Sequence, residues 1–504
     1  MTHRVRHSMI GRRARVMTGL AALAMSFLMQ ACALGEPATG PVQNQPQAAS
    51  QGPQALDRPP NIVILLADDL GYGGLGVQGD KEARTPNIDA LAVNGVRLTN
   101  AYANHPVCSP SRAALMTGIY QHRMGFEFNS GSPANTSDKF GVSLSQPTLP
   151  ERLKAAGYAT GMFGKWHVGF RPETQPTARG FDAFYGHLSG AHAYTPDGVG
   201  ERGAGRVSMM RGVQPASMPA HLTEAFAEEA VGFIRVHKDR PFLLYIPFNA
   251  VHSPMQTTPA YEAKFAHIQN RTRRIHLAML AAMDDAVGRV VDEIRAQGLD
   301  EQTLIMFSSD NGGPTQETTS SNGALNGVKG TVLEGGIRVP TLVRWTGRIE
   351  GGRTIDTLAM GFDLTATALA AAGLPTAGLD GVDLMPWLTG ARGGDAHEAL
   401  FWRAAGQGAV RAGNWKLVKN GEAYHLFDLS SDIRERTDLA AARPDVVADL
   451  RARYDAWSGA MAEPLWIRNE KAEPNPRAAL DRSRSSAQVE AFIRGERPQV
   501  SAED

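Results

Sequence analysis

Three apolar runs constrain the fold of this chain more than any other feature. Residues 61–67 read Asn, Ile, Val, Ile, Leu, Leu, Ala, and residues 242–246 and 303–307 are similarly apolar. Continuous runs of this kind are typical of strands buried on both faces of a parallel sheet. Between them lie helical patterns, the clearest over residues 275–294, where apolar side chains recur every third or fourth position. The alternation predicts an α/β fold with a mostly parallel central sheet between helices.

Each of these runs leads into polar residues. Asp68 and Asp69 directly follow the first run, Asp310 and Asn311 follow the third, and the second leads to His252. Open α/β sheets bind ligands at the carboxyl ends of their strands. A single Asp after a strand is more often a turn former or a helix cap. Two such strand ends together favour a divalent cation, and oxygen ligands suit calcium or magnesium rather than zinc.

The chain has 504 residues, more than one hydrophobic core usually supports, so a large and a small domain are expected. We predict the large domain at residues 59–395 and a small α+β domain with an antiparallel sheet at 396–470. Residues 471–504 are predicted to be an irregular tail. Lysine plus arginine and aspartate plus glutamate number 51 each. Because no net field attracts nucleic acid, no nucleic-acid partner is expected.

The amino terminus has the pattern of an export signal. Residues 1–32 place five arginines before an apolar stretch that is short for a bilayer span. Ala31 before Cys32 resembles a lipoprotein cleavage box, which predicts a lipid anchor at Cys32 as the only membrane contact. The alternative is an ordinary secretory signal in which Cys32 is incidental. Residues 33–58 are predicted to be a flexible tether. We expect an exported protein, periplasmic or at the cell surface, and an outer-membrane lipoprotein if the anchor forms.

A second cysteine, Cys108, precedes a short predicted helix. Pro110 near the first helical position and Gly118 just beyond the last predict a helix over residues 110–117. Free backbone N–H groups at the amino end of a helix attract anions and lower the pKa of a thiol. Cys108 is therefore either a nucleophilic thiol or a buried, inert cysteine. Arg112, one turn into the helix, can point at the same anion.

Residues 106–118, PVCSPSRAALMTG, resemble the signature of the type I sulfatases, the formylglycine-dependent branch of the alkaline phosphatase superfamily. The resemblance runs from about residue 61 to about residue 457. It implies an alkaline-phosphatase-like large domain. It also implies that a maturation enzyme, which recognises Cys-x-Pro-x-Arg, oxidises Cys108 to formylglycine.

Further motifs agree with this family in the same order. Segments that resemble its metal and catalytic motifs are ADDLGYG at 67–73, GKWHVG at 164–169, NAVHSP at 249–254, SDNG at 309–312 and GVKG at 327–330. By this resemblance, the ligands of one calcium ion per subunit are Asp68, Asp69, Asp310, Asn311 and the modified Cys108. The catalytic residues so implied are Cys108, Arg112, Lys165, His167, His252 and Lys329. Glu334, Arg338, Asp284 and Asp285 are instead predicted to be structural.

The resemblance implies a sulfuric ester hydrolase that releases inorganic sulfate. A hydroxyl of hydrated formylglycine attacks sulfur, and His252 or Lys329 protonates the departing alcohol. Cationic side chains aimed at the sulfate oxygens offset its negative charge.

The substrate is expected to be a sulfated polysaccharide or oligosaccharide. The segment GFDAFYGH at 180–187 resembles polysaccharide-desulfating members of the family. His187, His192 and Tyr194 could therefore line a sugar pocket, with His105 near the nucleophile; structural or surface roles are the alternative. Two other functions stay open. One is a phosphonate or phosphate ester hydrolase of the same superfamily, and the other is a non-catalytic glycan-binding surface lipoprotein with unmodified Cys108.

Overall fold

The computed structural model describes residues 58–130, 137–196, 209–218, 221–404, 406–466 and 484–496. All of them belong to one compact unit, Pro53–Asp504. The predicted signal peptide, Cys32 and the tether up to residue 57 lie outside the described residues. Along the described ranges, we find no helix that combines the length and apolar character needed to cross a bilayer.

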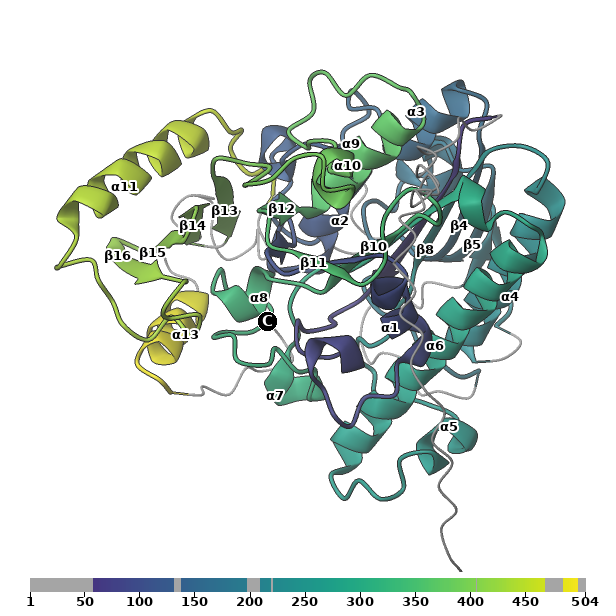
Figure 1. The fold of residues 1–504 in the computed structure, drawn as a ribbon, viewed down its shortest axis with the longest axis horizontal. Coiled ribbons are helices and arrows are strands. Elements are labelled where there is room, and N and C mark those ends of the chain that lie inside the picture. Colours follow the sequence, from purple (N-terminus) through teal and green to yellow (C-terminus); the bar gives the residue numbers. More distant parts are fainter. Residues whose placement is uncertain are drawn as a thin grey trace, which may run out of the picture. The chain divides into compact units, whose positions relative to one another are not determined.

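A mixed sheet, mostly parallel, forms the centre of this unit (Figure 1). Within the described residues its ten strands lie in the order β11 (Arg353–Ile355), β2 (Val96–Leu98), β10 (Thr341–Arg344), β9 (Thr303–Ser309), β1 (Asn61–Ala67), β8 (Phe242–Pro247), β4 (Ala159–Lys165), β5 (Ala183–His187), β6 (Met210–Arg211) and β7 (Gln214–Pro215). The strands from β9 to β5 run parallel. Strand β10 is antiparallel to both β9 and β2. The three strands predicted from apolar runs are β1, β8 and β9, and all three are fully buried.

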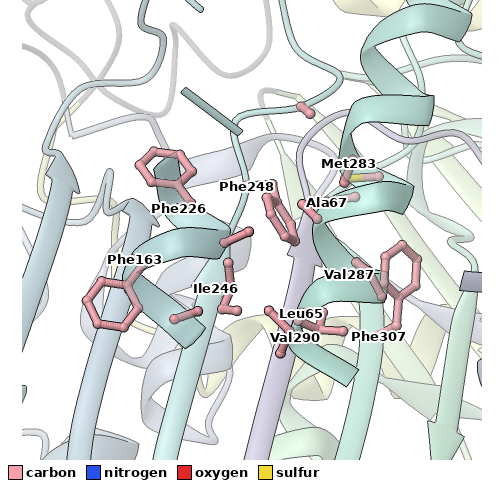
Figure 2. Packing of buried hydrophobic residues seen from close by; sticks show 14 of the residues in the cluster. Leu65, Ala67, Phe163, Phe226, Ile246, Phe248, Met283, Val287, Val290 and Phe307 are labelled. Carbon is pink, nitrogen blue, oxygen red and sulfur yellow. The ribbon is translucent and has the colours of Figure 1, made fainter. Parts of the chain in front are cut away.

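Side chains alternate across the sheet, so each face has its own core. From β1, Leu65 and Ala67 belong to one cluster together with residues of helices α4 (Leu222–His237) and α6 (Arg271–Ala296), as Figure 2 shows. Ile62 and Ile64 from the same strand belong to the cluster on the other face. That face is covered by α2 (Cys108–Thr117), α3 (Leu149–Ala155) and α9 (Gly361–Ala371). Burial on both sides explains why β1 has no polar side chain between Asn61 and Asp68.

Several shorter elements accompany this sheet. They include helices α1 (Pro86–Val93), α5 (Pro259–Ala263), α7 (Thr315–Thr318), α8 (Glu334–Ile337) and α10 (Met385–Leu388), and the paired strands β3 (Ala101–Tyr102) and β12 (Ala359–Met360). Helix α1 packs against α6. Its first turn is capped from outside, because the Asp284 carboxylate of α6 accepts hydrogen bonds from the backbone N–H groups of Asn87 and Ile88. Asp284 is therefore structural, as predicted.

A small antiparallel sheet follows, as the fold prediction requires. Its strands are β13 (Leu400–Ala404), β14 (Gln407–Ala412), β15 (Trp415–Asn420) and β16 (Ala423–Asp428), and helix α11 (Pro444–Gly459) packs on it.

The prediction of an irregular tail at 471–504 is wrong for one segment. Residues Arg484–Ile493 form helix α13. Its buried Val489 and Phe492 join a core cluster that also contains Trp402 and Val418 of the small sheet. Few apolar residues mark this helix in the sequence, and burial against the sheet rather than local propensity stabilises it.

Candidate active site

The carboxyl ends of β1 and β9 bring together the acidic residues that follow them. The two strands are parallel, with Ala67 opposite Ser309, so the next residues on each strand are neighbours. The backbone N–H of Asp69 donates to Asp310 Oδ1 at 3.2 Å. The side-chain amide of Asn311 donates to Asp69 Oδ1 at 2.7 Å. The four predicted oxygen ligands therefore lie at one sheet edge.

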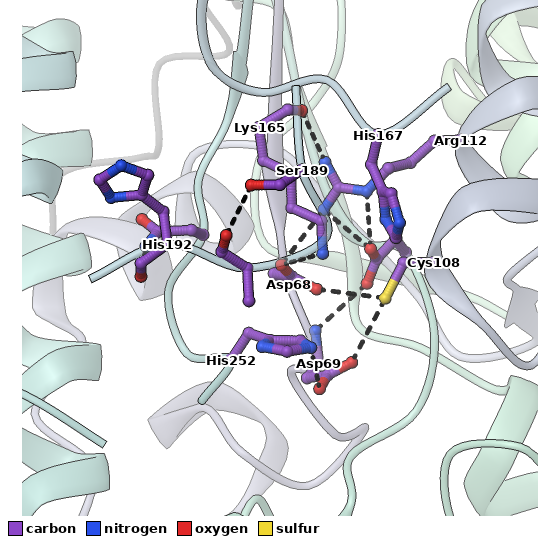
Figure 3. A network of polar contacts seen from close by, with 12 residues as sticks. Asp68, Asp69, Cys108, Arg112, Lys165, His167, Ser189, His192 and His252 are labelled. Atoms are coloured by element: carbon purple, nitrogen blue, oxygen red, sulfur yellow. Dashed lines mark hydrogen bonds and ion pairs between the residues drawn. The ribbon is translucent and has the colours of Figure 1, made fainter. Parts of the chain in front are cut away.

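Cys108 lies against this edge, at the start of α2 (Figure 3). Its Sγ is 3.5 Å from Asp68 Oδ1 and 3.9 Å from Asp69 Oδ1. The helix begins at Cys108, two residues before the predicted start, because Val107 is extended and the chain turns helical immediately after it. Pro110 then falls within the first turn, where its missing N–H costs nothing.

The local electrostatics disfavour a thiolate at Cys108. Burial raises the pKa of the thiol far above its ordinary value, and the nearby Lys165 and Lys329 do not offset this effect. Asp310 and Asp68 raise the pKa further. Burial thus opposes the lowering of the thiol pKa that is expected at a helix amino terminus, and it favours the neutral thiol in the unmodified side chain.

Arg112 links the strand ends from within α2. Its Nε donates to Asp310 Oδ2 at 2.8 Å, and its Nη1 donates to the carbonyl oxygen of Lys165 at 2.9 Å. Nη2 is 3.7 Å from Asp68 Oδ2. Although burial alone would lower the pKa of this guanidinium, Asp310 and Asp68 raise it, so Arg112 stays charged.

Two lysines pair with the two adjacent aspartates. Lys165, the last residue of β4, places Nζ 2.6 Å from Asp68 Oδ2, and both side chains are fully buried. Lys329 places Nζ 2.8 Å from Asp69 Oδ2. Burial opposes the charged form of Lys329, but Asp69 outweighs this effect and raises the pKa of the amine well above its ordinary value. Conversely, burial alone would raise the pKa of Asp69, but Lys329, His252 and Lys165 hold it well below the ordinary value.

His252 completes the group on the side of β8. Its Nε2 is 3.6 Å from Asp69 Oδ2, and its Nδ1 lies 2.6 Å from the carbonyl oxygen of Ser253. A carbonyl can only accept, so Nδ1 carries the proton and Nε2 is directed to the site. Burial and the Lys329 charge lower the pKa of His252 to about 4, with a partial offset from Asp69. The imidazole is therefore neutral near pH 7.

His167 occupies the opposite side, close to Cys108 (Figure 3). It has a left-handed backbone conformation with φ of 60°, and Asp69 has a φ of 61°. Such conformations are unfavourable for residues other than glycine and persist where the surrounding contacts impose them. A Cβ atom on Gly190 would lie 2.8 Å from His167 Cε1, so a larger residue there would require the imidazole to move. Burial, together with Lys165 and Arg112, lowers the pKa of His167 well below its ordinary value.

The residues present fit a divalent cation. Asp68, Asp69, Cys108 and His252 offer ligand atoms that all lie within 4.8 Å of one another. Asn311 Oδ1 is buried and has no hydrogen-bond partner among the described residues. Asp310 belongs to the same strand end, although its oxygens accept from Asp69 and Arg112. Hard oxygen donors from carboxylates and one amide suit calcium or magnesium.

Two serines that were not among the predicted site residues hold these loops together. Ser320 Oγ accepts from the Gly71 N–H at 2.9 Å and donates to the Asp69 carbonyl oxygen at 2.8 Å. Ser309 Oγ accepts from the Leu70 N–H and donates to the carbonyl oxygen of Asn311, both at 3.0 Å. Ser309 falls inside a quoted motif, but Ser320 has no local signal because its partners lie far away in the sequence.

The four predicted substrate residues do not form an open pocket in the described structure. His105, His187 and Tyr194 are buried, and only His192 is partly exposed. His105 Nδ1 accepts from the Val107 N–H, and burial lowers the pKa of His105 to about 3. His187 contacts the carbonyl oxygen of Ser189 through Nδ1. The structural alternative therefore fits His105, His187 and Tyr194.

Comparison with known proteins identifies the family. The family model described as Sulfatase matches residues 60–374. Arylsulfatase A of Homo sapiens is 35% identical over 428 residues, which cover 79% of this chain and 82% of that protein. N-acetylgalactosamine-6-sulfatase of Sus scrofa is 34% identical over 359 residues, covering 67% of this chain and 68% of that protein.

A solved structure agrees with the sequence relatives. The crystal structure of Ps i-CgsB in complex with k-i-k-neocarrahexaose is similar with a TM-score of 0.78 at 33% identity, covering 85% of this chain and 98% of that chain. The family match includes the large sheet, whose strands lie between β1 and β11 in the sequence, and the helices that cover it. The chain therefore belongs to the type I sulfatases of the alkaline phosphatase superfamily, a family of sulfate ester hydrolases.

Proposed function

We propose that this sulfatase uses formylglycine, formed from Cys108, and one calcium ion to release inorganic sulfate from a sulfated polysaccharide or oligosaccharide. The observation that carries the proposal is the position of Cys108. Its sulfur lies at the start of α2 within 3.9 Å of both adjacent aspartates. No other element of the described chain combines a modifiable side chain, hard oxygen ligands and buried cations.

The need for modification follows from the electrostatics. A buried thiol with a raised pKa is a poor nucleophile at neutral pH. A hydrated aldehyde at the same position would supply a hydroxyl for attack on sulfur. Because Cys108 is only 2% exposed in the folded protein, the maturation enzyme that we propose as a partner must act before folding is complete.

Calcium would be held by Asp68, Asp69, Asp310, Asn311 and the modified Cys108, with His252 close to the same position. When bound, the ion would polarise the nucleophilic hydroxyl and offset the negative charge of the ester. The uncharged Asn311 Oδ1, buried with no hydrogen-bond partner in the described part of the chain, supports an oxygen-seeking cation there.

The protein's own cations would bind the sulfate group. Arg112, Lys165 and Lys329 are held around the carboxylates in a buried site, where charges act more strongly than in water. His252 and Lys329 are the candidates for protonating the departing alcohol, and His167 for activating the second hydroxyl. Of the two candidate acids, Lys329 is already charged at neutral pH, whereas His252 becomes an acid only after it gains a proton.

A glycan substrate is supported by the similarity to Ps i-CgsB, whose structure contains k-i-k-neocarrahexaose. Export would place the enzyme where such polymers occur, in the periplasm or at the cell surface. Acylation of Cys32 would hold it at a membrane. Fractionation and palmitate labelling test this part, because Cys32→Ser should abolish labelling and leave sulfate release unchanged.

The chemistry is tested by mass spectrometry of the peptide that contains Cys108, from protein made with and without a formylglycine-generating enzyme. We expect an aldehyde and sulfate release only in the first preparation, and no turnover by Cys108→Ala. An intact thiol in an active preparation would contradict the proposal. Matched sulfate and phosphate esters of one alcohol would reveal a phosphate or phosphonate ester hydrolase, if turnover of the phosphate ester prevailed.

A further inference from the structure

A buried phenol lies beneath the turn that carries His252. Residues 249–252 form a turn closed by the His252 N–H, which donates to the carbonyl oxygen of Asn249 at 2.9 Å. The Tyr194 hydroxyl lies within hydrogen-bond distance of the carbonyl oxygens of both Asn249 and His252, the latter at 2.9 Å. One hydroxyl therefore bridges the first and last residues of the turn.

Tyr194 is itself fixed by its surroundings. Its side chain is fully buried. Its backbone N–H donates to Gln256 Oε1 at 3.0 Å, and its carbonyl oxygen accepts from the N–H of Leu222, the first residue of α4, at 2.8 Å. Its ring stacks on the His221 ring at a centroid distance of 5.7 Å. These contacts hold the phenolic hydroxyl in a fixed position.

The same turn is tied to the strand end that carries the carboxylates. The Asp68 N–H donates to the carbonyl oxygen of Ala250 at 2.9 Å, and the Val251 N–H donates to that of Asp68 at 2.8 Å. These bonds hold the middle of the turn, whereas Tyr194 holds both its ends. His252 Nδ1 donates to the carbonyl oxygen of Ser253, the first residue after the turn, and this leaves Nε2 facing Asp69.

We propose that Tyr194 is a positioning residue that fixes the His252 imidazole at the sulfate site and does not contact the sugar. This inference depends on the proposed role of His252 in sulfate ester hydrolysis. Loss of the phenolic hydroxyl would leave buried carbonyls with one donor fewer, and the turn could relax. A displacement of about 1 Å at a catalytic group can cost about 100-fold in rate.

The test replaces the hydroxyl alone, with Tyr194→Phe. Tyr185→Phe is the matched control, because Tyr185 is also buried in the same core and donates to a backbone carbonyl oxygen, that of Ser217, at 2.9 Å. With aryl sulfates of good and poor leaving groups, we expect kcat of Tyr194→Phe to fall about 10-fold to 100-fold. KM should change less than kcat, and Tyr185→Phe should stay within about 2-fold of the wild type.

A double-variant cycle separates positioning from a general structural effect. In a His252→Ala background, Tyr194→Phe should cause little further loss, because the two residues act through one imidazole. The kcat of the Tyr194→Phe single variant should also depend on the leaving group in the same way as the kcat of His252→Ala. Additive losses in the double variant, or a loss confined to KM on oligosaccharides, would overturn the inference in favour of a structural or sugar-binding tyrosine.

A crystal structure of Tyr194→Phe gives an independent readout. We expect the His252 ring to be displaced while Asp68 and Asp69 keep their positions. An unmoved imidazole would contradict the role of Tyr194 even if activity fell. Failure of the proposed function has a different signature, since matured wild-type protein would then release no sulfate from any ester.

Discussion

Lys329 Nζ lies 2.8 Å from Asp69 Oδ2, although 260 residues separate the two positions in the sequence. Asp69 also contacts Asn311 and His252, so one carboxylate is shared by a lysine, an amide and an imidazole. The cations proposed to bind sulfate therefore already pair with the carboxylates proposed to bind calcium. Calcium binding and substrate binding should therefore depend on each other.

Lys329→Ala should lower kcat/KM by about 100-fold to 1,000-fold, because a preorganised charge in a buried site is lost. Steady-state kinetics on an aryl sulfate measures this effect. The control is Lys264→Ala, whose side chain is 43% exposed and pairs with Asp285. A comparable loss in both variants would show that charge at Lys329 has no special role.

Ser320→Ala should weaken calcium binding by about 10-fold to 100-fold, since residues that orient metal ligands have effects of this size. The hydroxyl joins the Asp69 carbonyl oxygen to the Gly71 N–H. Calcium titration by calorimetry checks this, and excess calcium should restore activity. Ser321→Ala is the neighbouring control, because its hydroxyl accepts from the nearby Gly323 N–H and not from the loop that carries Asp69, among the described residues. Equal calcium affinities in the two variants would contradict this prediction.

Asp284→Asn should change how stability depends on pH. Burial raises the pKa of Asp284 from 3.8 to about 6, against hydrogen bonds from Ile88 and Asn87 that lower it. Because the folded state binds this proton more tightly, the stabilisation is complete below pH 3.8 and is lost as pH rises through about 6.

Urea unfolding across this interval measures the effect. As pH rises, the free energy of unfolding of the wild type should decrease relative to that of Asp284→Asn by up to about 1.4 kcal/mol per pH unit. Asp292→Asn, on the same helix with a side chain that is 72% exposed, should preserve the wild-type slope. Parallel curves for wild type and Asp284→Asn would mean that this carboxylate titrates normally.

Lys416→Met should destabilise the folded protein by about 3 to 5 kcal/mol, because the buried Glu435 carboxylate loses its lysine partner, although Glu334 keeps its ion pair with Arg338. The Lys416 amine lies 2.9 Å from Glu334 Oε1 and 2.8 Å from Glu435 Oε1, and all three side chains are buried. Denaturant unfolding measures the loss. Lys419→Met on the same strand, where the amine donates to the Gly421 carbonyl oxygen, should cost less than about 1 kcal/mol. Similar losses would argue against a buried ionic core.

Much of the fold was predictable because its central strands have a recognisable apolar sequence pattern. The runs that became β1, β8 and β9 are buried on both faces, and burial leaves a continuous apolar pattern. Helix α6, Arg271–Ala296, was predictable from its periodic apolar residues, because one of its faces packs on the sheet. Helix α13 was not, because its few buried residues contact a sheet that is distant in sequence.

The site was predictable where residues follow strand ends, and less so where they act through other residues. Asp68 and Asp310 are adjacent in space because their strands are adjacent, a relation that the sequence pattern suggested. The position of Tyr194 was different. An aromatic residue close to residues 180–187, which resemble polysaccharide-desulfating relatives, was compatible with an open pocket, whereas its hydroxyl in fact lies against the backbone of a distant turn. Nothing local to Tyr194 encodes that partner.

The order in which the site residues occur along the chain has a consequence for biosynthesis. Cys108 emerges from the ribosome before β8, β9 and the Lys329 loop have been made, and these later segments contribute the groups that enclose it. The growing chain therefore exposes the cysteine for as long as translation takes to add more than 200 further residues. At rates of about 5 to 20 residues per second, this interval lasts for at least about 10 s. Slower translation through this stretch would lengthen the time for the proposed modification of Cys108, and rapid overproduction would favour folded protein that keeps the thiol.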